Sequence, residues 1–280
     1  MGRIRNTIEL AKTSWGVLQK DRELVILPVL SFIAAALVFA VFVIPGVLAL
    51  PEETTSAATT EEQPIPALSV ILFVLGSLAA TVVSVFFTGA LVAGAHERMS
   101  GGDPTVGSAI GKATQRIPGL VPWALLTATV GMIIQALRER AGAIGGFLLG
   151  GIDLAWNVAS FLTIPAIVID DKGPIDGFKS SAGLLRQTWG ENLASQVGFG
   201  LVGFVAAIPA IVLVAIAAAA NVTAFLVAAF IIAAAWIALV LAVISALGGI
   251  FKAALYMYAT QGRAPEGFEQ ANLGGTFTRR

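Results

Sequence analysis

The 280-residue chain is 57% hydrophobic and only 12% charged, and its mean hydropathy is +0.87. Soluble domains average about 25% charged residues, so this chain has too little polar surface for water, and lipid must be its solvent. Its 17 basic and 17 acidic residues cancel, which argues against nucleic-acid binding. The lack of cysteine excludes disulfides and thiol catalysis. The single histidine, His96, argues against His-based metal sites.

The first expected element is an amphipathic helix within residues 1–23. Its apolar residues step by 4, 3, 4 and 3 and form one stripe, with basic residues on the other faces; they are Ile4, Ile8, Ala11, Trp15 and Leu18. Trp15 suits the headgroup layer, and the basic face suits anionic lipid. We therefore expect this helix to lie on the membrane.

Six apolar runs follow, and each has the ~20 residues needed to cross the hydrocarbon core. They are Leu24–Leu50, Ala67–Ala95, Gly119–Leu137, Ala143–Ile169, Leu193–Ala220 and Ala224–Ile250. The first run begins after about two dozen polar or amphipathic residues, so we interpret it as a retained span and not a signal peptide. The predicted fold is all-α, a polytopic membrane helical bundle of six transmembrane helices.

Two polar segments between spans resemble the N-terminal helix. In residues 96–118 the apolar positions again step by 4, 3 and 4, at Val106, Ile110, Ala113 and Ile117. In residues 170–192 a helix is expected to start at Pro174, with a stripe of Ile175, Phe178, Ala182, Leu185 and Trp189. This makes three cytoplasmic interfacial amphipathic helices, with Trp15, Phe178 and Trp189 as membrane-interface residues.

Orientation follows from the Lys and Arg residues. Fifteen of the 17 lie in the N-terminal segment, the 96–118 and 170–192 loops and the stretch from Lys252 onward, and the opposite side has only Arg138 and Arg140. The positive-inside rule then predicts a multi-pass protein of the cell (plasma) membrane with both termini cytoplasmic.

The order helix, span, span occurs three times, at about 1–99, 100–170 and 171–258. These units form one integral membrane domain, followed by an expected flexible cytoplasmic tail at 259–280. Pro104, Gly107 and Arg116 lie 70 positions before Pro174, Gly177 and Arg186, which favours internal repetition. The alternative is that basic, Trp-bearing helices are common at any cytoplasmic face. Repeats running in one direction differ from the inverted repeats of many transporters.

The fourth span carries a polar face. Gly146, Gly150, Asp153, Asn157 and Ser160 step by 4, 3, 4 and 3, and Gly142 extends the glycine series. Small residues allow a neighbouring helix to approach, and polar side chains hydrogen-bond across such a contact. An ionised aspartate at this depth costs ~2.5–3.5 kcal/mol on insertion scales, so it should be paired, protonated or in water.

Three interpretations of Asp153 stay open. It fixes the fourth span against another helix; it binds a proton or cation, with Asn157 and Ser160 as neutral ligands; or it lies shallower, within reach of Arg138 or Arg140. The glycines Gly142, Gly146 and Gly150 are expected to pack against a neighbouring helix in the first case.

Several local motifs resemble a family of uncharacterised prokaryotic multispanning proteins, defined only as a domain of unknown function. They are Ile164-Pro165-Ala166-Ile167-Val168, Gly173-Pro174-Ile175-Asp176-Gly177-Phe178-Lys179-Ser180-Ser181, Thr188-Trp189-Gly190-Glu191, and the opening Ala11-Lys12-Thr13-Ser14-Trp15 with Asp21-Arg22-Glu23-Leu24. The chain is also distantly similar to the membrane domain beside some glycerophosphodiester phosphodiesterases, whose catalytic domain has no counterpart here. The resemblance implies architecture and location, and no activity.

Two classes of function are weighed. The first is a non-enzymatic membrane protein, with a membrane-organising role or acting as a small channel or carrier that uses Asp153. The second is a lipid-modifying enzyme, which would need paired carboxylates or a His/Asp cluster at the cytoplasmic face. Asp170, Asp171 and Asp176 are the only acidic cluster there and are better explained as loop charges and helix caps. We therefore predict no catalytic residue, metal or cofactor. The expected partner is the bilayer, with anionic lipid at the cytoplasmic face, and the alanine-rich last two spans leave a homo-oligomer open.

Overall fold

The computed structural model describes residues 12–50, 65–186, 192–220 and 222–269, and the side chains of residues 143–144 and 185–202 lie outside this description. Secondary structure within these ranges is helical throughout. A helical segment at residues 12–20 comes first. The elements that follow are η1 (Arg22–Val25), α2 (Ile26–Leu48), α4 (Ala67–Met99), α5 (Val106–Gln115), α6 (Ile117–Arg140), α7 (Gly142–Ser160), α8 (Thr163–Asp170), α9 (Pro174–Arg186), α10 (Asn192–Ala219) and α11 (Thr223–Gln261).

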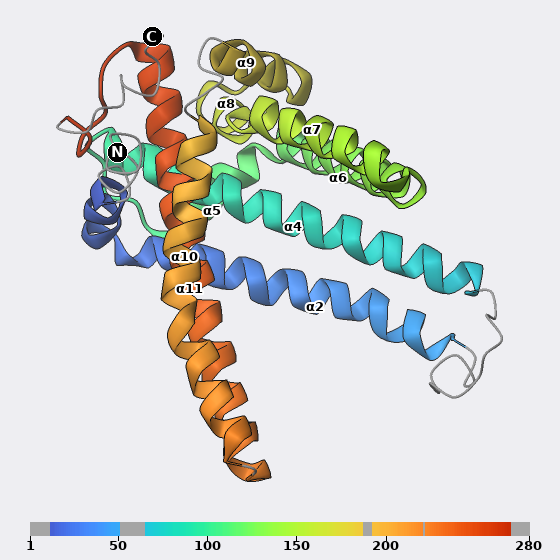
Figure 1. Ribbon diagram of the computed structural model, residues 1–280. Coiled ribbons are helices and arrows are strands. Elements are labelled where there is room, and N and C mark those ends of the chain that lie inside the picture. The colour runs from blue at the N-terminus through green and yellow to red at the C-terminus, as the bar shows by residue number, and fades with distance from the viewer. Residues whose placement is uncertain (1–11, 51–64, 187–191, 221, 270–280) are drawn as a thin grey trace.

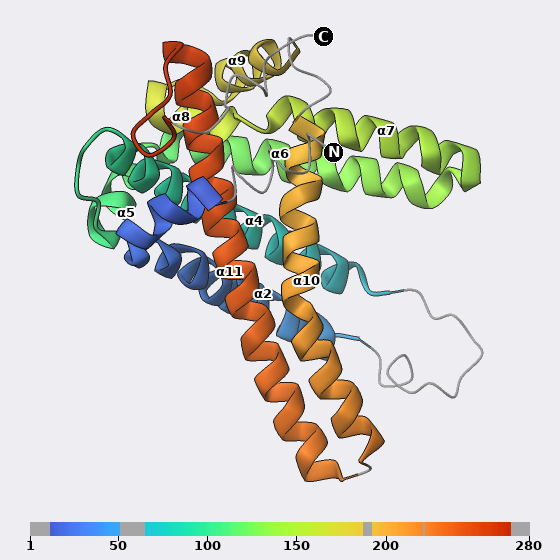
Figure 2. The same ribbon diagram turned by 60° about the vertical axis from the view of Figure 1, so that its left-hand side comes forward.

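The long described helices form three hairpins, α2–α4, α6–α7 and α10–α11, which spread from one common region (Figure 1). In both views α10–α11 points in a different direction from the other two hairpins (Figure 2). The short elements and both ends of the described chain gather where the hairpins meet. We call this region the hub, and its core contains Leu24, Ala90–Ala95, Leu120, Leu162–Val168 and Ala246–Met257.

Five described helical segments are long and apolar enough to span a membrane, and they support a multi-pass membrane protein. They are Arg22–Leu48, Ala67–Met99, Ile117–Arg140, Gly145–Asp170 and Thr223–Gln261. Residues Gly203–Ala219 of α10 form a shorter apolar helix. The predicted all-helical membrane fold is therefore confirmed, while the sixth span stays a prediction.

The long helices extend beyond the thickness of a bilayer. α4 has 33 residues and α11 has 39, so they are ~50 and ~58 Å long, against a hydrocarbon core of ~30 Å. Counting ~20 residues from the free end of each hairpin places the hub-side boundary of the hydrocarbon near residue 29 of α2, 86 of α4 and 242 of α11. The hub core begins at these positions, so the hub lies at headgroup depth and beyond it.

The segment at residues 12–20 packs into the hub along a face that differs from the predicted one. Ser14, Val17 and Leu18 are buried, whereas Trp15 is 44% exposed. Leu18 thus belongs to the protein core, and Trp15 keeps the exposure that a membrane-interface residue needs. Of the predicted stripe, Trp15 and Leu18 are described and differ in burial, while Ile4, Ile8 and Ala11 lie outside the described residues. The position of this helix on the membrane stays a prediction.

The expectation of a flexible tail from residue 259 is wrong for its first part. α11 continues to Gln261, and residues 262–269 return to the hub. The Phe268 side chain is fully buried, and the Glu266 amide donates to the Met99 carbonyl oxygen at 3.4 Å. Burial of one aromatic side chain is enough to hold this segment in place, and residues 270–280 lie outside the described part.

Phe178, one of the three predicted membrane-interface residues, packs on aromatic rings of the second hairpin, and its place at the interface stays a prediction. Its ring stacks with Trp156 of α7 at a centroid distance of 5.1 Å and with Trp123 of α6 at 5.9 Å. The three rings join α9 to the second hairpin. Stacked aromatic pairs add ~0.5–1.5 kcal/mol beyond the burial of their area, and this explains why Phe178 turns toward protein. Trp189, the third predicted anchor, lies outside the described residues.

Candidate functional site

Asp153 lies in α7, 11 residues beyond Gly142 and therefore ~16 Å along the helix from the free end of its hairpin. Its carboxylate pairs with Arg138 of α6 at 3.2 Å, and both side chains are about two-fifths exposed. The Asn157 amide donates to the same carboxylate at 3.1 Å. An aspartate at this depth is thus paired, as the cost of burying its charge demands.

The geometry of Asp153 has one feature of the shallow interpretation and one of the interpretations that place it inside the span. Its contact with Arg138 is the one expected for an aspartate near the end of the span, whereas its position along α7 is that of a residue well inside the span. Ser160 is separate from the carboxylate, because its hydroxyl donates to the carbonyl oxygen of Asn157 at 3.3 Å. Asp153 and Asn157 therefore form one polar unit with Arg138, and Ser160 contacts only the backbone of Asn157.

The glycine face of α7 does not contact another helix in the described structure. A Cβ atom placed at Gly142, Gly146 or Gly150 would meet no described atom within 4 Å, so the packing role of these three residues stays a prediction. Gly142 has a φ of +47°, a conformation that side chains disfavour. Its role is the tight turn between α6 and α7.

Close helix approach occurs at other glycines, both within the first hairpin, where a Cβ atom at Gly46 or Gly76 would lie 2.8 Å from Phe73 or 3.0 Å from Phe42, and in the hub. Side chains placed at Gly89, Gly94, Gly119 and Gly249 would collide with Leu120, Leu24, Ile167 and Leu91, respectively. These contacts bring α4 against η1, α6 and α11, and α6 against α8. Small residues at such points let backbones approach and increase the dispersion contacts between helices.

Charged side chains in the hub connect segments that are distant in sequence. Arg98, near the end of α4, forms a two-point contact with Asp21 through Nε and Nη2 and also reaches Asp103 at 2.6 Å. Asp21 is only 6% exposed. A planar guanidinium matches a carboxylate in this way, so Arg98 ties the N-terminal segment to the first hairpin.

A second polar cluster joins α11 to the loop between α8 and α9. The Tyr256 hydroxyl donates to Asp170 Oδ2 at 2.5 Å, and Lys172 Nζ lies 3.1 Å from both the Tyr256 hydroxyl and the Asp170 carboxylate. Partial burial by itself would lower the pKa of the Lys172 ammonium, but the hydrogen bonds to Tyr256 and Asp170 raise that pKa above its ordinary value. Lys172 is therefore firmly cationic at neutral pH.

The fourth span is interrupted where it enters the hub. α7 ends at Ser160 and α8 begins at Thr163, and the Leu162 amide donates to the buried Ser181 hydroxyl of α9 at 2.9 Å. A helix start leaves amide donors without intrahelical partners, and Ser181 satisfies one of them from another element. This contact sets α9 across the end of the second hairpin, with Gly177 against Thr163 and Ile167.

Residues 65–268, from just before α4 to the buried Phe268, match a family of unknown function, DUF6159. The chain belongs to this family. No curated protein and no solved structure matches it. The predicted membership of an uncharacterised family is thus confirmed for DUF6159, while the likeness to the membrane domain beside glycerophosphodiester phosphodiesterases and the prokaryotic source stay predictions.

The polar clusters of the hub are the contacts that sequence reasoning missed. Asp21, Arg98 and Tyr256 each stood in the sequence as an ordinary boundary residue, and nothing in local spacing connects positions 77 or 86 residues apart. Within the described ranges no three His, Asp or Glu side chains gather in a way that could hold a metal ion. The polar groups that do gather are paired in ways that hold helices together.

Proposed function

We propose that this DUF6159 protein is a non-enzymatic scaffold of the plasma membrane, with six spans, both termini and the hub on the cytoplasmic side. The observation that carries the proposal is the pairing of hub charges with one another across elements, as in Arg98 with Asp21 and Lys172 with Asp170. Such pairs fix the ends of hairpins, and a catalytic group would need to be available to a substrate.

The free halves of the hairpins suit a lipid-facing role. Large apolar side chains are exposed along them, including Leu37, Val41, Phe147, Phe230 and Ile231, at 63–83%. Exposed apolar area of this extent is unfavourable in water and favourable against acyl chains. Together with the Lys and Arg residues that accumulate at the hub, it supports a bilayer-embedded body with an inner-leaflet polar base.

The orientation can be tested by cysteine labelling, because the chain has no cysteine of its own. Ser100→Cys lies in the hub between α4 and α5, and Val222→Cys lies at the exposed turn between α10 and α11. In whole cells a membrane-impermeant maleimide should label Val222→Cys only. Ser100→Cys should react after permeabilisation. Labelling of Ser100→Cys in intact cells would overturn the proposed orientation.

A carrier that uses Asp153 is the second candidate, and its support is the carboxylate–amide unit inside the span. Arg138 already supplies the positive charge that a bound cation would bring, so a carrier would have to displace that arginine. Proton and K⁺ flux into vesicles separates the two functions. A scaffold leaves vesicles as tight as protein-free ones, and a carrier gives flux that Asp153→Asn abolishes while the variant still folds.

The enzyme alternative is tested with the same vesicles. Incubation with phospholipid and added Mg²⁺, Mn²⁺ or Zn²⁺ should leave the lipids unchanged. Metal-dependent turnover of a phospholipid would refute the non-enzymatic proposal.

A further inference from the structure

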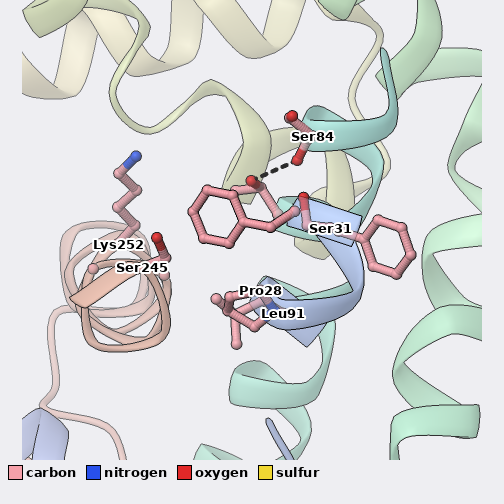
Figure 3. Close-up of a pocket in the computed structure, with 11 residues that line it drawn as sticks. Pro28, Ser31, Ser84, Leu91, Ser245 and Lys252 are labelled. Atoms are coloured by element: carbon pink, nitrogen blue, oxygen red, sulfur yellow. Dashed lines mark hydrogen bonds between the residues drawn. The ribbon is translucent and has the colours of Figure 1, made fainter. Parts of the chain in front are cut away.

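A pocket of about 340 Å³ lies between α2, α4 and α11, where the first and third hairpins meet (Figure 3). Its lining includes the hydroxyl residues Ser31, Ser84, Thr88 and Ser245 and a lysine, Lys252. The figure shows Lys252 and Ser245 on one helix, α11, and Ser31 and Ser84 on the neighbouring helices α2 and α4. The volume is at the lower end of small-molecule sites, which span ~300–1,000 Å³.

Lys252 is half-buried and has no carboxylate within ion-pair distance among the described residues. Its ammonium lies 4.9 Å from the centre of the Phe161 ring, a contact that leaves its three donors available. The other hub cations, Arg98, Lys112 and Lys172, all have acidic partners. Lys252 is thus the lysine of the pocket that is in position to take an anion.

The hydroxyl groups of the pocket divide into two kinds. Ser84 and Thr88 donate to carbonyl oxygens of their own helix at 2.9 and 2.8 Å, as such residues commonly do in spans. Ser31 and Ser245 make no hydrogen bond within the described residues, so both can donate to a ligand. Two free hydroxyls on neighbouring helices and one ammonium form a donor set suited to phosphate oxygens.

The depth of the pocket indicates where its ligand comes from. The hydrocarbon boundary estimated from helix lengths falls near residues 29, 86 and 242; α2 and α4 line the pocket close to this level, and α11 lines it on the hub side, from Ser245 to Lys252. Pro28, Phe32, Phe87 and Leu91 provide its apolar wall, and Phe32 is 45% exposed. A lipid could therefore place its headgroup in the pocket and its acyl chains along α2 and α4.

We propose that this pocket binds one anionic phospholipid of the inner leaflet, with its phosphate on Lys252, Ser31 and Ser245. The proposal rests on the membrane orientation proposed above, and it adds a specific lipid site between the hairpins. A bound lipid would bridge α11 to α2 and α4 and so connect the first hairpin to the third at the boundary of the hub.

Native mass spectrometry of the full-length protein in mild detergent tests this, with phosphatidylglycerol and phosphatidylcholine of the same chains as probes. One phosphatidylglycerol should be retained at least tenfold more tightly than phosphatidylcholine. Lys252→Met keeps the side-chain length and should remove this preference. Lys179→Met is the matched control, because Lys179 is 73% exposed and its ammonium lies 3.9 Å from the Asp176 carboxylate. This variant should retain phosphatidylglycerol as the parent protein does.

Gly248→Leu gives an independent variant that keeps the charge. A Cβ atom at Gly248 meets nothing within 4 Å, so leucine can occupy the pocket without displacing a neighbour. It should weaken phosphatidylglycerol retention at least tenfold. Retention unchanged in both Lys252→Met and Gly248→Leu would overturn the proposal.

Binding of inorganic phosphate, measured in the same way, distinguishes a lipid site from a site for a free anion. Phosphate binding that depends on Lys252 and is as tight as phosphatidylglycerol binding would assign the pocket to a soluble anion and overturn the lipid proposal. These measurements use detergent-solubilised protein, so they do not depend on the cysteine-labelling result. A wrong orientation and a wrong ligand are therefore recognised separately.

Discussion

Arg98→Met tests the contact between Arg98 and Asp21, the hub contact whose loss should destabilise the protein most. Asp21 is 6% exposed and has Arg98 as its cationic partner, so the substitution leaves a buried carboxylate without a counter-charge. Breaking a buried pair in this way costs about 3–5 kcal/mol. The upper limit is set by protonation, because an unpaired carboxyl can take up a proton instead of staying charged.

The size of that limit depends on pH. With an ordinary aspartate pKa of ~3.9 and ~1.36 kcal/mol per pH unit, protonation costs about 4 kcal/mol at pH 7 and about 1.5 kcal/mol at pH 5. The folded variant then binds a proton that the unfolded chain does not, so its stability falls as pH rises. We expect Arg98→Met to lose about 4 kcal/mol at pH 7 and about 1.5 kcal/mol at pH 5 in an SDS titration from mild detergent, followed by tryptophan fluorescence.

Two companion variants make the result interpretable. Asp21→Asn combined with Arg98→Met removes the buried charge and should recover most of the loss at pH 7. Lys112→Met breaks a more exposed pair with Glu97 and should cost at most about 1 kcal/mol. A loss in Arg98→Met that is equal at both pH values, or a double variant no more stable than the single one, would refute the reasoning.

Three further predictions concern other hub contacts, all measured with the same titration. Ser181→Ala leaves the buried Leu162 amide without its acceptor and should cost about 1–3 kcal/mol, whereas Ser181→Thr should retain most of the stability; equal losses would contradict a hydrogen-bonding role. Phe268→Ala removes a fully buried ring and should cost about 3–5 kcal/mol; no loss would mean that residues 262–269 do not contribute to the core. Lys172 has a pKa raised above 10.5, so its stabilising contribution is fully present below pH 10.5 and is lost as pH rises through the folded value. As pH rises above 10.5, the free energy of unfolding should therefore fall less in Lys172→Met than in the parent chain. Parallel curves of unfolding free energy against pH for the two chains would contradict this.

The spans were predictable because their physical cause is local. About 20 consecutive apolar residues are sufficient to cross a bilayer, and runs such as Ala67–Ala95 show this without reference to any other part of the chain. The helix starting at Pro174 was also evident from local chemistry. The distal halves of the hairpins behave as this reasoning expects, since their side chains face outward.

The packing of the hub was not predictable in the same way, because the apolar face of an amphipathic helix does not show whether protein or lipid covers it. Leu18 and Phe178 were expected to face lipid, and they pack on protein. An apolar face gains ~25 cal/mol per Å² when it leaves water, whichever apolar partner it finds. The helix periodicity that predicted membrane-surface helices is therefore equally compatible with helices that cover the hub.

One quantity in the sequence does separate these outcomes, and it is length. α4 and α11 continue for 33 and 39 residues, well beyond the ~20 that hydrocarbon requires, and their excess turns must be covered by something other than acyl chains. The excess turns carry Gly89, Gly94 and Gly249, which pack closely, but Gly46 and Gly76 also pack closely within the first hairpin, whereas a Cβ atom at Gly146 or Gly150 would meet no described atom within 4 Å. The spacing that Gly142, Gly146 and Gly150 share with Asp153 therefore does not distinguish a contact between helices from a face without one, because spacing along one helix does not state which residues lie opposite.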